Sequence, residues 1–398
     1  MYELTGIPRN YAWGSTTQIQ QLLGLPQDGG PLAEVWFGAH PTDPSGVTDE
    51  QGRQTTLDRL IDSDPARLLG RRSISEFGPT LPFLMKFLAP GEPVSLQVHP
   101  TPANAHTGFI AEQIEGVPID APHRSFKDTN HKPEMVFALT EFSGLVGFRD
   151  PALIVELLAA YNHPALRGAH RLLAAEPGPA GMKECLRRLV ELGAAEVDQI
   201  VAEATQLSAN GPEVADAHQM VAELAQYFPG DAGCVASLML VHMRFRPGDC
   251  LFVPSGIPHA YLSGLCVEVM ANSDNVFRAG LTNKYVDVEG LLANTRFDPT
   301  PLAMLPGDEI APGVRVLSPE AAEFALTVVT CTSGGEQVIA GSGPRIAVCV
   351  DGLVTVRAER ATAPDPLSLP VGGALFAADV DGDLTVAGHG LLVIASVP

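Results

Sequence analysis

The sequence predicts a mainly β fold with an α-helical insertion: a β domain is interrupted by helices and followed by a second β domain. Short apolar runs separated by Pro and Gly occupy both ends of the chain, and a block rich in Ala, Leu and Glu lies between them. Many short strands joined by Gly- and Pro-containing turns favour a barrel or a jelly roll. The 398 residues, 45% of them hydrophobic, suffice for about two or three domains.

Residues 1–150 are expected to be the first part of the interrupted β domain. The runs at 81–88 and 94–98 are short and apolar, and turn residues bound them. Such runs indicate strands.

Residues 151–234 are expected to form the helical insertion. Val197, Ile200, Val201 and Ala204 recur at i, i+3, i+4 and i+7. This is the period of an α-helix with one apolar face.

Strand character returns at 235–299, the predicted second part of the first β domain, where Val241, Met243 and Phe245 alternate with polar residues. Residues 300–398 are expected to form the second β domain. Two apolar runs there, 345–350 and 353–357, flank Asp351-Gly352, which predicts a β-hairpin.

The charge balance limits the partners. Lys and Arg number 25 against 46 Asp and Glu, a formal net charge of −21. Nucleic acids and anionic membranes attract basic surfaces, so we expect neither as a partner. No apolar run approaches the roughly 20 residues that span a bilayer, and the first residues lack the features of a signal peptide. With six scattered cysteines, a cytoplasmic protein with reduced thiols is expected.

Two spaced motifs supply candidate metal ligands. Gln97 and His99 lie two residues apart in a predicted strand, so both side chains point to one face. Far downstream, Gly248 begins the pattern Gly-x5-Pro-x-Gly-x2-His, which ends at His259. The two stretches match the two motifs of cupin barrels, with Gln97 where the first motif commonly has His.

Glu134 is the candidate carboxylate ligand. It ends the stretch Asp128-Thr-Asn-His-Lys-Pro-Glu134, and Pro133 before it interrupts regular pairing, which could present the carboxylate inward. A mixed oxygen and nitrogen set suits zinc or another borderline divalent ion. The predicted ligands are Gln97, His99, Glu134 and His259.

A cluster of charged residues accompanies these motifs. Buried charges cost free energy unless they are paired, so such a cluster indicates a site or a structural ion-pair network. Hydride transfer is not expected, because no predicted strand is followed by Gly-x-Gly-x-x-Gly. Nucleotide-dependent phosphoryl transfer is not expected either, because the chain has no Gly-x4-Gly-Lys-Ser/Thr loop. Chemistry on a phosphorylated carbonyl compound fits better. The cluster comprises Glu268, Asp274, Arg278 and Lys284; Lys132 is close to the candidate ligand Glu134, and Lys86 interrupts the apolar run at 81–88.

These stretches resemble those of the type I mannose-6-phosphate isomerases (phosphomannose isomerases), zinc-dependent enzymes of the cupin superfamily. The matching segments, in the family's order, are 10–14, 33–41, 81–86, 95–100, 128–134 and 259–284. The resemblance implies a cupin-type jelly-roll catalytic domain, a helical domain and a second, degenerate cupin-like β domain.

The resemblance also implies one zinc ion per chain, a phosphorylated hexose as substrate and a monomer. The reaction would interconvert mannose 6-phosphate and fructose 6-phosphate through a cis-enediol, and Lys132 or a group near Asp274 could carry the proton between C2 and C1. The implied catalytic residues are Arg278, Lys132, Asp274 and Glu268, the implied substrate-binding residues are Trp13, Lys86, His131, Tyr261 and Lys284, and zinc would be bound by Gln97, His99, Glu134 and His259.

Two alternatives stay open at this point. Without Gln97, two His and one carboxylate are the ligand set of non-haem iron(II) oxygenases, many of which are cupins. A non-catalytic sugar-binding cupin with a structural metal is the other alternative.

Overall fold

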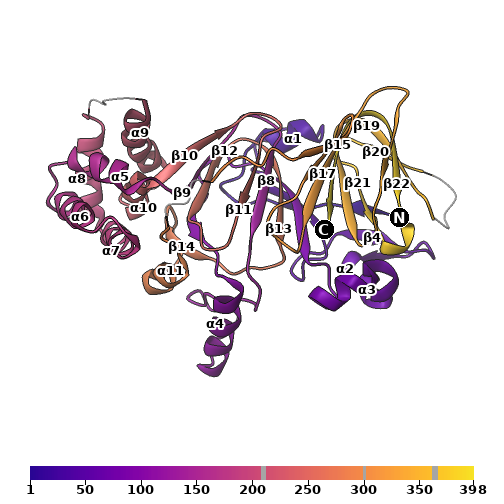
Figure 1. The fold of residues 1–398 in the computed structure, drawn as a ribbon, viewed down its shortest axis with the longest axis horizontal. Helices are drawn as coiled ribbons and strands as arrows, with labels where there is room; N and C mark the ends of the chain where they lie inside the picture. Colours follow the sequence, from indigo (N-terminus) through magenta and orange to yellow (C-terminus); the bar gives the residue numbers. More distant parts are fainter. Residues whose placement is uncertain (208–211, 299–301, 361–365) are drawn as a thin grey trace.

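A computed structural model describes residues 1–207, 212–298, 302–360 and 366–398 (Figure 1). The described chain is mainly β with helices, as the sequence predicts. The helices of residues 151–236 gather at one end of the molecule, and both chain termini lie toward the other end (Figure 1). None of the described helices has the length and apolar character that crossing a membrane requires.

Two antiparallel sheets form a sandwich in the middle of the molecule. Side chains from the two sheets meet in one buried layer that includes Val136, Val146 and Phe245. The five-stranded sheet has the order β10 (Leu240–Phe245), β9 (Phe142–Phe148), β12 (His259–Ser263), β7 (Leu96–Val98), β14 (Phe277–Gly280). The six-stranded sheet has the order β11 (Cys250–Val253), β8 (Glu134–Ala138), β13 (Cys266–Ala271), β6 (Phe83–Leu88), β3 (Glu34–Gly38), β2 (Ile7–Arg9).

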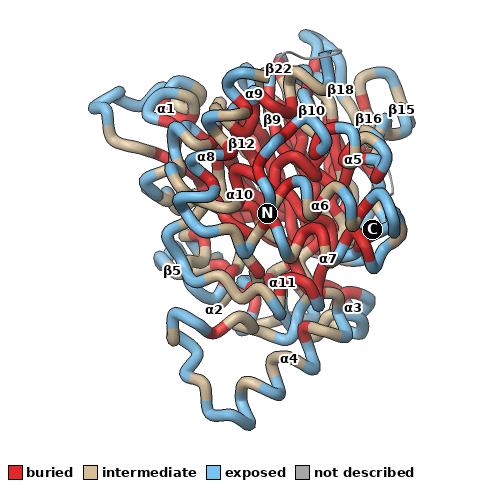
Figure 2. The backbone as a smooth tube through the Cα atoms, turned by 90° about the vertical axis from the view of Figure 1, so that its left-hand side faces the viewer, coloured by how far each residue is buried: buried red, intermediate tan, exposed pale blue. Residues whose placement is uncertain are grey.

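The six-stranded sheet is covered on both faces. Every residue of β3, β6, β8 and β13 is buried, which explains why these strands read as nearly continuous apolar runs. One face packs on the five-stranded sheet. The other face, with Phe87 and Met135, packs on Val348 and other residues of the C-terminal sheet. Figure 2 shows this buried interior enclosed by exposed loops and helices.

The C-terminal sheet has eleven strands in the described residues. The first strands of the chain belong to it, since Tyr2 of β1 lies opposite Phe376 of β21. The division of the chain at 150, 234 and 299 stays a prediction. The pairing of β1 with β21 means that strands from the start of the chain also belong to the C-terminal sheet. The order is β15 (Asp308–Ala311), β16 (Val314–Leu317), β17 (Ala325–Cys331), β22 (Leu384–Ser396), β19 (Arg345–Ala358), β21 (Ala374–Ala377), β1 (Tyr2–Thr5), β4 (Gly46–Thr48), β5 (Gln54–Thr56), with β18 (Glu336–Ile339) paired to β22 and β20 (Leu367–Pro370) paired to β19.

The hairpin predicted at Asp351-Gly352 is wrong. β19 runs through this dipeptide as one strand that pairs with β22 along its length. A register shift between Cys349 and Asp351, with Gly352 at φ +73°, marks a bulge. A bulge accommodates a glycine in the left-handed conformation and bends the strand without ending it. The same kind of glycine also occurs in tight turns, so Asp351-Gly352 resembled a hairpin turn in the sequence although it lies within one strand.

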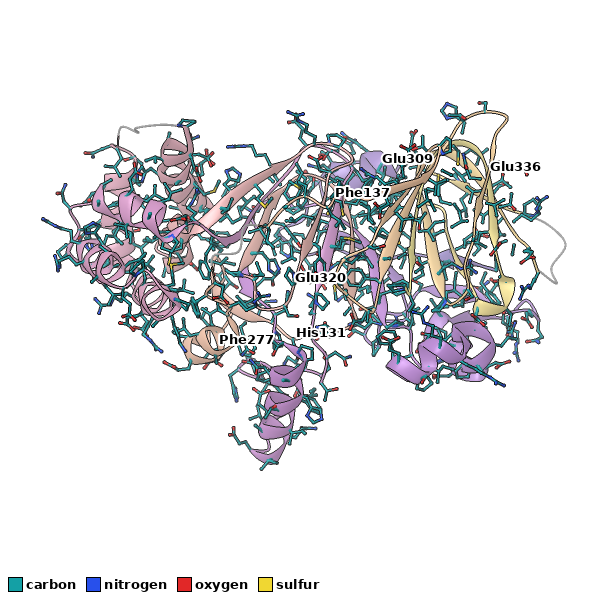
Figure 3. All side chains as sticks on the ribbon, viewed as in Figure 1. His131, Phe137, Phe277, Glu309, Glu320 and Glu336 are labelled. Atoms are coloured by element: carbon teal, nitrogen blue, oxygen red, sulfur yellow. The ribbon has the colours of Figure 1, made fainter. Side chains whose placement is uncertain are left out.

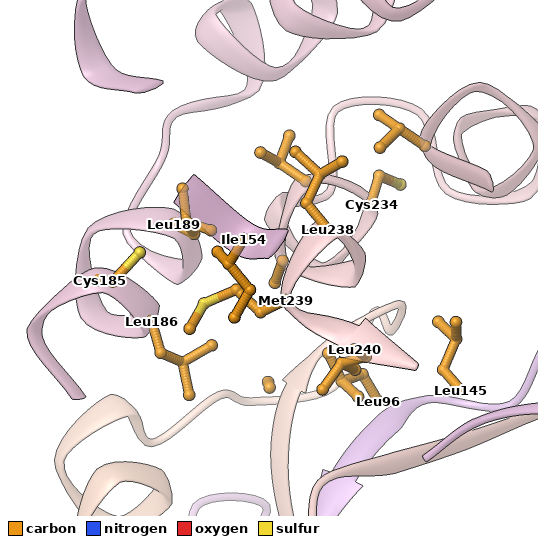
Figure 4. Close-up of a cluster of buried hydrophobic side chains, with 14 of the residues drawn as sticks. Leu96, Leu145, Ile154, Cys185, Leu186, Leu189, Cys234, Leu238, Met239 and Leu240 are labelled. Atoms are coloured by element: carbon orange, nitrogen blue, oxygen red, sulfur yellow. The ribbon is translucent and has the colours of Figure 1, made fainter. Parts of the chain in front are cut away.

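Helices cover the outer face of the five-stranded sheet. Leu96 and Leu145 of that sheet share one hydrophobic core with Leu238 and Met239, which follow the helix at 232–236, and Figure 4 shows part of this core. Pro begins α5, α6 and α7, where its missing N–H costs no hydrogen bond. The helices are α5 (Pro151–Ala159), α6 (Pro164–Ala175), α7 (Pro179–Val190), α8 (Ala194–Ala204), α9 (Pro212–Tyr227), α10 (Ala232–Ala236), the 3-10 helix Ser237–Met239 and α11 (Val288–Asn294).

The predicted apolar helix face is confirmed within α8. Val197, Ile200 and Ala204 are buried, and Val201 is half-buried against the same core. The remaining helices lie outside this cluster. They are α1 (Gln18–Leu22), α2 (Leu57–Ser63), α3 (Pro65–Phe77), the 3-10 helix Asp379–Asp381 and the largely exposed α4 (Pro102–Ile114), which projects from the molecule in Figure 1.

Candidate metal centre and active site

Strand pairing places three of the predicted site residues in one row. Gln97 of β7 lies opposite His259 of β12 on one side and Arg278 of β14 on the other. Leu96 and Val98, the neighbours of Gln97, point to the helical core. Because side chains alternate along a strand, the row of Gln97 faces the interior of the sandwich.

The six-stranded sheet presents a facing set of charged residues. Glu268 of β13 lies opposite Lys86 of β6, and Glu134 begins the neighbouring strand β8. Phe87 and Met135, which follow Lys86 and Glu134, pack toward the C-terminal sheet. The charged side chains therefore point the other way, toward the row on the five-stranded sheet.

His99, Glu134 and His259 form a compact group between the two sheets. The Nε2 atom of His99 lies 3.1 Å from Oε1 of Glu134, and Nε2 of His259 lies 3.2 Å from Oε2. One donor atom from each residue lies within 4.8 Å of the others, and all three residues are buried. Gln97 adds an amide, whose Nε2 lies 3.5 Å from Nε2 of His259.

Both imidazole rings are held in the orientation that metal binding requires. Nδ1 of His99 donates to the carbonyl of Asn275 at 2.7 Å, and Nδ1 of His259 donates to the carbonyl of Ile257 at 2.9 Å. A carbonyl can only accept, so Nδ1 carries the proton and Nε2 of the neutral ring has a free lone pair. Among the described residues, the buried Nε2 of His99 has no hydrogen-bond partner.

The protonation states suit a zinc site. Burial and the charge of Lys132 lower the pKa of His99 to about 4, so the ring is neutral at pH 7. Burial opposes ionisation of Glu134, but the charge of Lys132 outweighs it and holds the pKa of this carboxyl well below its usual range. Neutral imidazoles and an ionised carboxylate are ordinary zinc ligands. The donor set therefore fits zinc.

Two further predicted residues contact Glu134. Lys132 Nζ lies 3.1 Å from Oε1, and the hydroxyl of Tyr261 donates to Oε2 at 3.0 Å. Burial raises the pKa of Tyr261 well above its usual value, so the hydroxyl keeps its proton. Tyr261 thus lies directly beside the metal-binding group.

Lys86 is the centre of a buried ion-pair network. Its Nζ lies 2.6 Å from Glu268 and 3.2 Å from Glu34, which also accepts a hydrogen bond from Trp36 at 2.7 Å. Burial disfavours the charged lysine, but the two carboxylates outweigh it and raise the pKa of Lys86. Burial raises the pKa of Glu268 to about 7, against the opposing charge of Lys86.

A cavity of about 960 Å³ adjoins this group, and we call it the site cavity. Four of the predicted residues line it: His131, Asp274, Arg278 and Lys284. The metal-binding residues are not among the described residues that line the cavity, but Arg278, which does line it, pairs in register with Gln97.

Trp13, Lys86 and Tyr261, which were predicted to line the substrate site, are not among the described residues that line the site cavity. Lys86 and Tyr261 belong to the interior of the sandwich, as described above. Trp13 is half-buried, stacks on Tyr11 with ring centroids 5.6 Å apart, and packs against the sandwich core.

The charges of the cavity wall fall into two kinds. Asp274 is half-exposed, with Oδ1 3.6 Å from Nε2 of the buried His40. By contrast, the side chains of Arg278 and Lys284 make neither a hydrogen bond nor an ion pair to any residue that the structure describes. Burial lowers the pKa of both, and Arg278 lowers that of Lys284 further. Two neighbouring cations without partners suit an anionic ligand.

Asn275 is a site residue that our sequence reasoning missed. It is fully buried, its carbonyl orients His99, and its side chain bonds to the backbone of Lys127, Asp128 and Asn130. Its place in the matching segment 259–284 is the only signal for it in the sequence. Glu34, His40 and Glu323 were missed as well, although the first two lie in the matching stretch 33–41.

Comparisons with known proteins identify relatives of this chain. The family model "Phosphomannose isomerase type I, catalytic domain" matches residues 1–151. The mannose-6-phosphate isomerase of Escherichia coli (strain K12) is 37% identical over 395 residues, covering 98% of each chain. That of Homo sapiens is 31% identical over 408 residues, covering 94% of this chain and 93% of the other.

Solved structures give the same result. A zinc-bound crystal structure of mannose 6-phosphate isomerase matches with a TM-score of 0.88 and 32% identity, covering 100% of this chain and 99% of that one. A mutant phosphomannose isomerase from Salmonella typhimurium matches with a TM-score of 0.90, 31% identity and the same coverage. With a relative this similar over nearly its whole length, the chain belongs to the type I phosphomannose isomerase family.

Proposed function

We propose that this protein is a zinc-dependent aldose–ketose isomerase that interconverts mannose 6-phosphate and fructose 6-phosphate. The observation that carries the proposal is the buried group of His99, Glu134 and His259 beside a cavity whose wall holds two cations without a partner in the described parts of the chain. Full-length similarity to proteins named mannose-6-phosphate isomerase supports the same activity.

His99, Glu134 and His259 would hold the zinc ion, with Gln97 as the fourth ligand. When bound, zinc supplies a Lewis acid for the oxygen atoms of the sugar on which negative charge develops. The chain provides for this with free Nε2 lone pairs and an ionised carboxylate.

Arg278 and Lys284 would bind the anionic groups of the substrate. Arg278 lies in register beside Gln97 and thus next to the metal-binding group, so we assign it to the charge that develops on the cis-enediol. Lys284 then remains for the phosphate. A preorganised cation at a developing charge is among the largest contributions to catalysis.

Lys132 is the proposed proton carrier. Its amine lies beside Glu134, and 14% of its side chain is exposed. Glu268, by contrast, has a side chain that is 1% exposed and paired with Lys86. To act as the base, Lys132 would give up the proton that pairs it with Glu134 in the free protein, and its amine would then take the proton from C2 of the open-chain sugar and return it to C1. The buried pair of Glu268 and Lys86 would then set the electrostatic environment of the site from the six-stranded sheet. Asp274 would contact the sugar from the cavity wall.

We further propose that the five- and six-stranded sheets are a cupin-type jelly roll made by 1–150 and 235–299, with a helical domain at 151–234. The sheet of 300–398, completed by β1, β4 and β5, would be a degenerate second cupin-like domain. A monomer in the cytoplasm remains our prediction.

Metal analysis combined with an isomerase assay tests the function. Protein purified without added metal should contain about one zinc per chain and convert mannose 6-phosphate, and chelation followed by added zinc should abolish and restore turnover. Iron with oxygen consumption would instead identify an oxygenase. Sugar binding with no turnover in the zinc-loaded protein would identify a binding protein.

A further inference from the structure

One contact joins the C-terminal sheet to the loop that carries Lys132. Glu323 precedes β17, and its Oε1 lies 2.6 Å from Nε2 of His131. A carboxylate can only accept, so Nε2 of His131 carries the proton and donates it to Glu323. Both residues line the site cavity, together with Arg278.

The position of Glu323 is fixed by the next residue in the chain, Phe324, which packs in the core. Phe324 is fully buried, and its ring meets Phe252 of β11 edge to face, with centroids 6.4 Å apart. β11 borders β8, the strand that Glu134 begins. Figure 3 labels His131 and also Glu320, which lies in the segment leading to Glu323.

The loop at 128–133 has separate anchors on either side of His131. The carbonyl of Asn130 accepts hydrogen bonds from Asn275 and Ser273, and the carbonyl of Pro133 accepts one from Ala271. Between these points, His131 is held through its side chain. Besides Glu323, the ring has a longer contact of 3.4 Å to Ser255.

The protonation state of Glu323 is consistent with this role. Burial would raise the pKa of Glu323, but the hydrogen bond from His131 outweighs it and keeps the pKa below the usual value. The side chain is 14% exposed, so the charged acceptor is largely shielded from water. A charge-assisted hydrogen bond in such surroundings fixes the ring more firmly than a neutral one.

We propose that Glu323 is a positioning residue for the isomerase reaction, which acts through His131 and through the loop that presents Lys132. The inference rests on the proposed function. It means that the C-terminal sheet, which supplies none of the proposed metal ligands, completes the wall of the active site. The expected loss is in turnover, because a misplacement of about 1 Å at a reacting group costs on the order of 10²-fold.

Four variants test the inference in the zinc-loaded, full-length protein: Glu323→Ala, Glu323→Gln, His131→Ala and the double variant. Glu320→Ala is the matched control, because Glu320 is an exposed glutamate of the same segment. We expect kcat of Glu323→Ala to fall about 10²-fold with zinc content and thermal unfolding nearly unchanged. Glu323→Gln, which keeps an acceptor for Nε2–H, should recover most of that loss.

The double variant separates positioning from stability. If Glu323 acts through His131, removing Glu323 from His131→Ala should cause no further loss of kcat, whereas independent effects would multiply. Ring ¹⁵N shifts of His131 should change in Glu323→Ala and stay unchanged in Glu320→Ala. Near-wild-type kcat in folded, zinc-loaded Glu323→Ala, or multiplying losses, overturns the inference alone. An inactive wild-type protein overturns the proposed function instead.

Discussion

Replacing Asn275 by Ala should weaken zinc binding although Asn275 is not a ligand. The N–H groups of Lys127 and Asp128 and the carbonyl of Asp128 would lose their partner. An unsatisfied buried polar group costs about 1–3 kcal/mol. Because water reaches this half-exposed loop, we take the lower value for each of the three groups, about 3 kcal/mol in total. The loop then shifts the carbonyl that orients His99, and loss of such a support typically costs about 10–100-fold in metal affinity.

Competition with a chelator measures the zinc affinity of Asn275→Ala, and urea unfolding measures its stability. Asn162→Ala is the control, because Asn162 is exposed, lies in the helical region and uses only its backbone N–H in a hydrogen bond. Zinc affinity within twofold of wild type, together with unchanged stability, would refute the claim that Asn275 holds the loop and His99 together.

Three further predictions address the rest of the site. His259→Ala should lose zinc and activity together while the circular dichroism spectrum stays native, and a variant that keeps full zinc and turnover would remove His259 from the ligands. Arg278→Ala and Arg278→Lys should both lose about 10²–10³-fold in kcat at unchanged zinc, since a lysine cannot reproduce the guanidinium fork; a loss confined to KM would indicate phosphate binding. Because burial raises the pKa of Glu268 from 4.5 to about 7, the native state holds this proton to higher pH than the unfolded state, so wild-type stability should fall relative to Glu268→Gln as pH rises from 4.5 to 7. Urea unfolding at several pH values checks this prediction, and a constant difference would contradict it.

Sequence patterns predicted those features that depend on near neighbours. The alternation around Gln97 and the helical period from Val197 to Ala204 are local, so they identified a strand and a helix face. The Asp351-Gly352 signal was local as well, but it failed, because the same left-handed glycine serves a turn or a bulge. Only the pairing of β19 with β22 along its whole length decides between them.

The supporting contacts could not be predicted, because they join distant parts of the chain. Asn275 meets Asp128 across 147 positions, and Glu323 meets His131 across 192. Neither residue stands out by type or spacing, since a buried Asn and a loop Glu are common. Their role becomes visible only in the folded chain, where the pairing of strands brings loops from the three sheets together around the site.

The buried charges between the two central sheets differ from Arg278 and Lys284 at the wall of the site cavity, because the former are paired within the chain and the latter are not paired among the described residues. In the interior, Lys86 has two carboxylates and Glu134 has Lys132, so these two buried charges are compensated within the chain. At the cavity wall, Arg278 and Lys284 have no such partner among the described residues, and burial already lowers the pKa of both. A partly buried, uncompensated charge destabilises the free protein. In the proposed function an anionic substrate would relieve that cost on binding: its phosphate would neutralise Lys284, and the charge that develops on the enediol would neutralise Arg278.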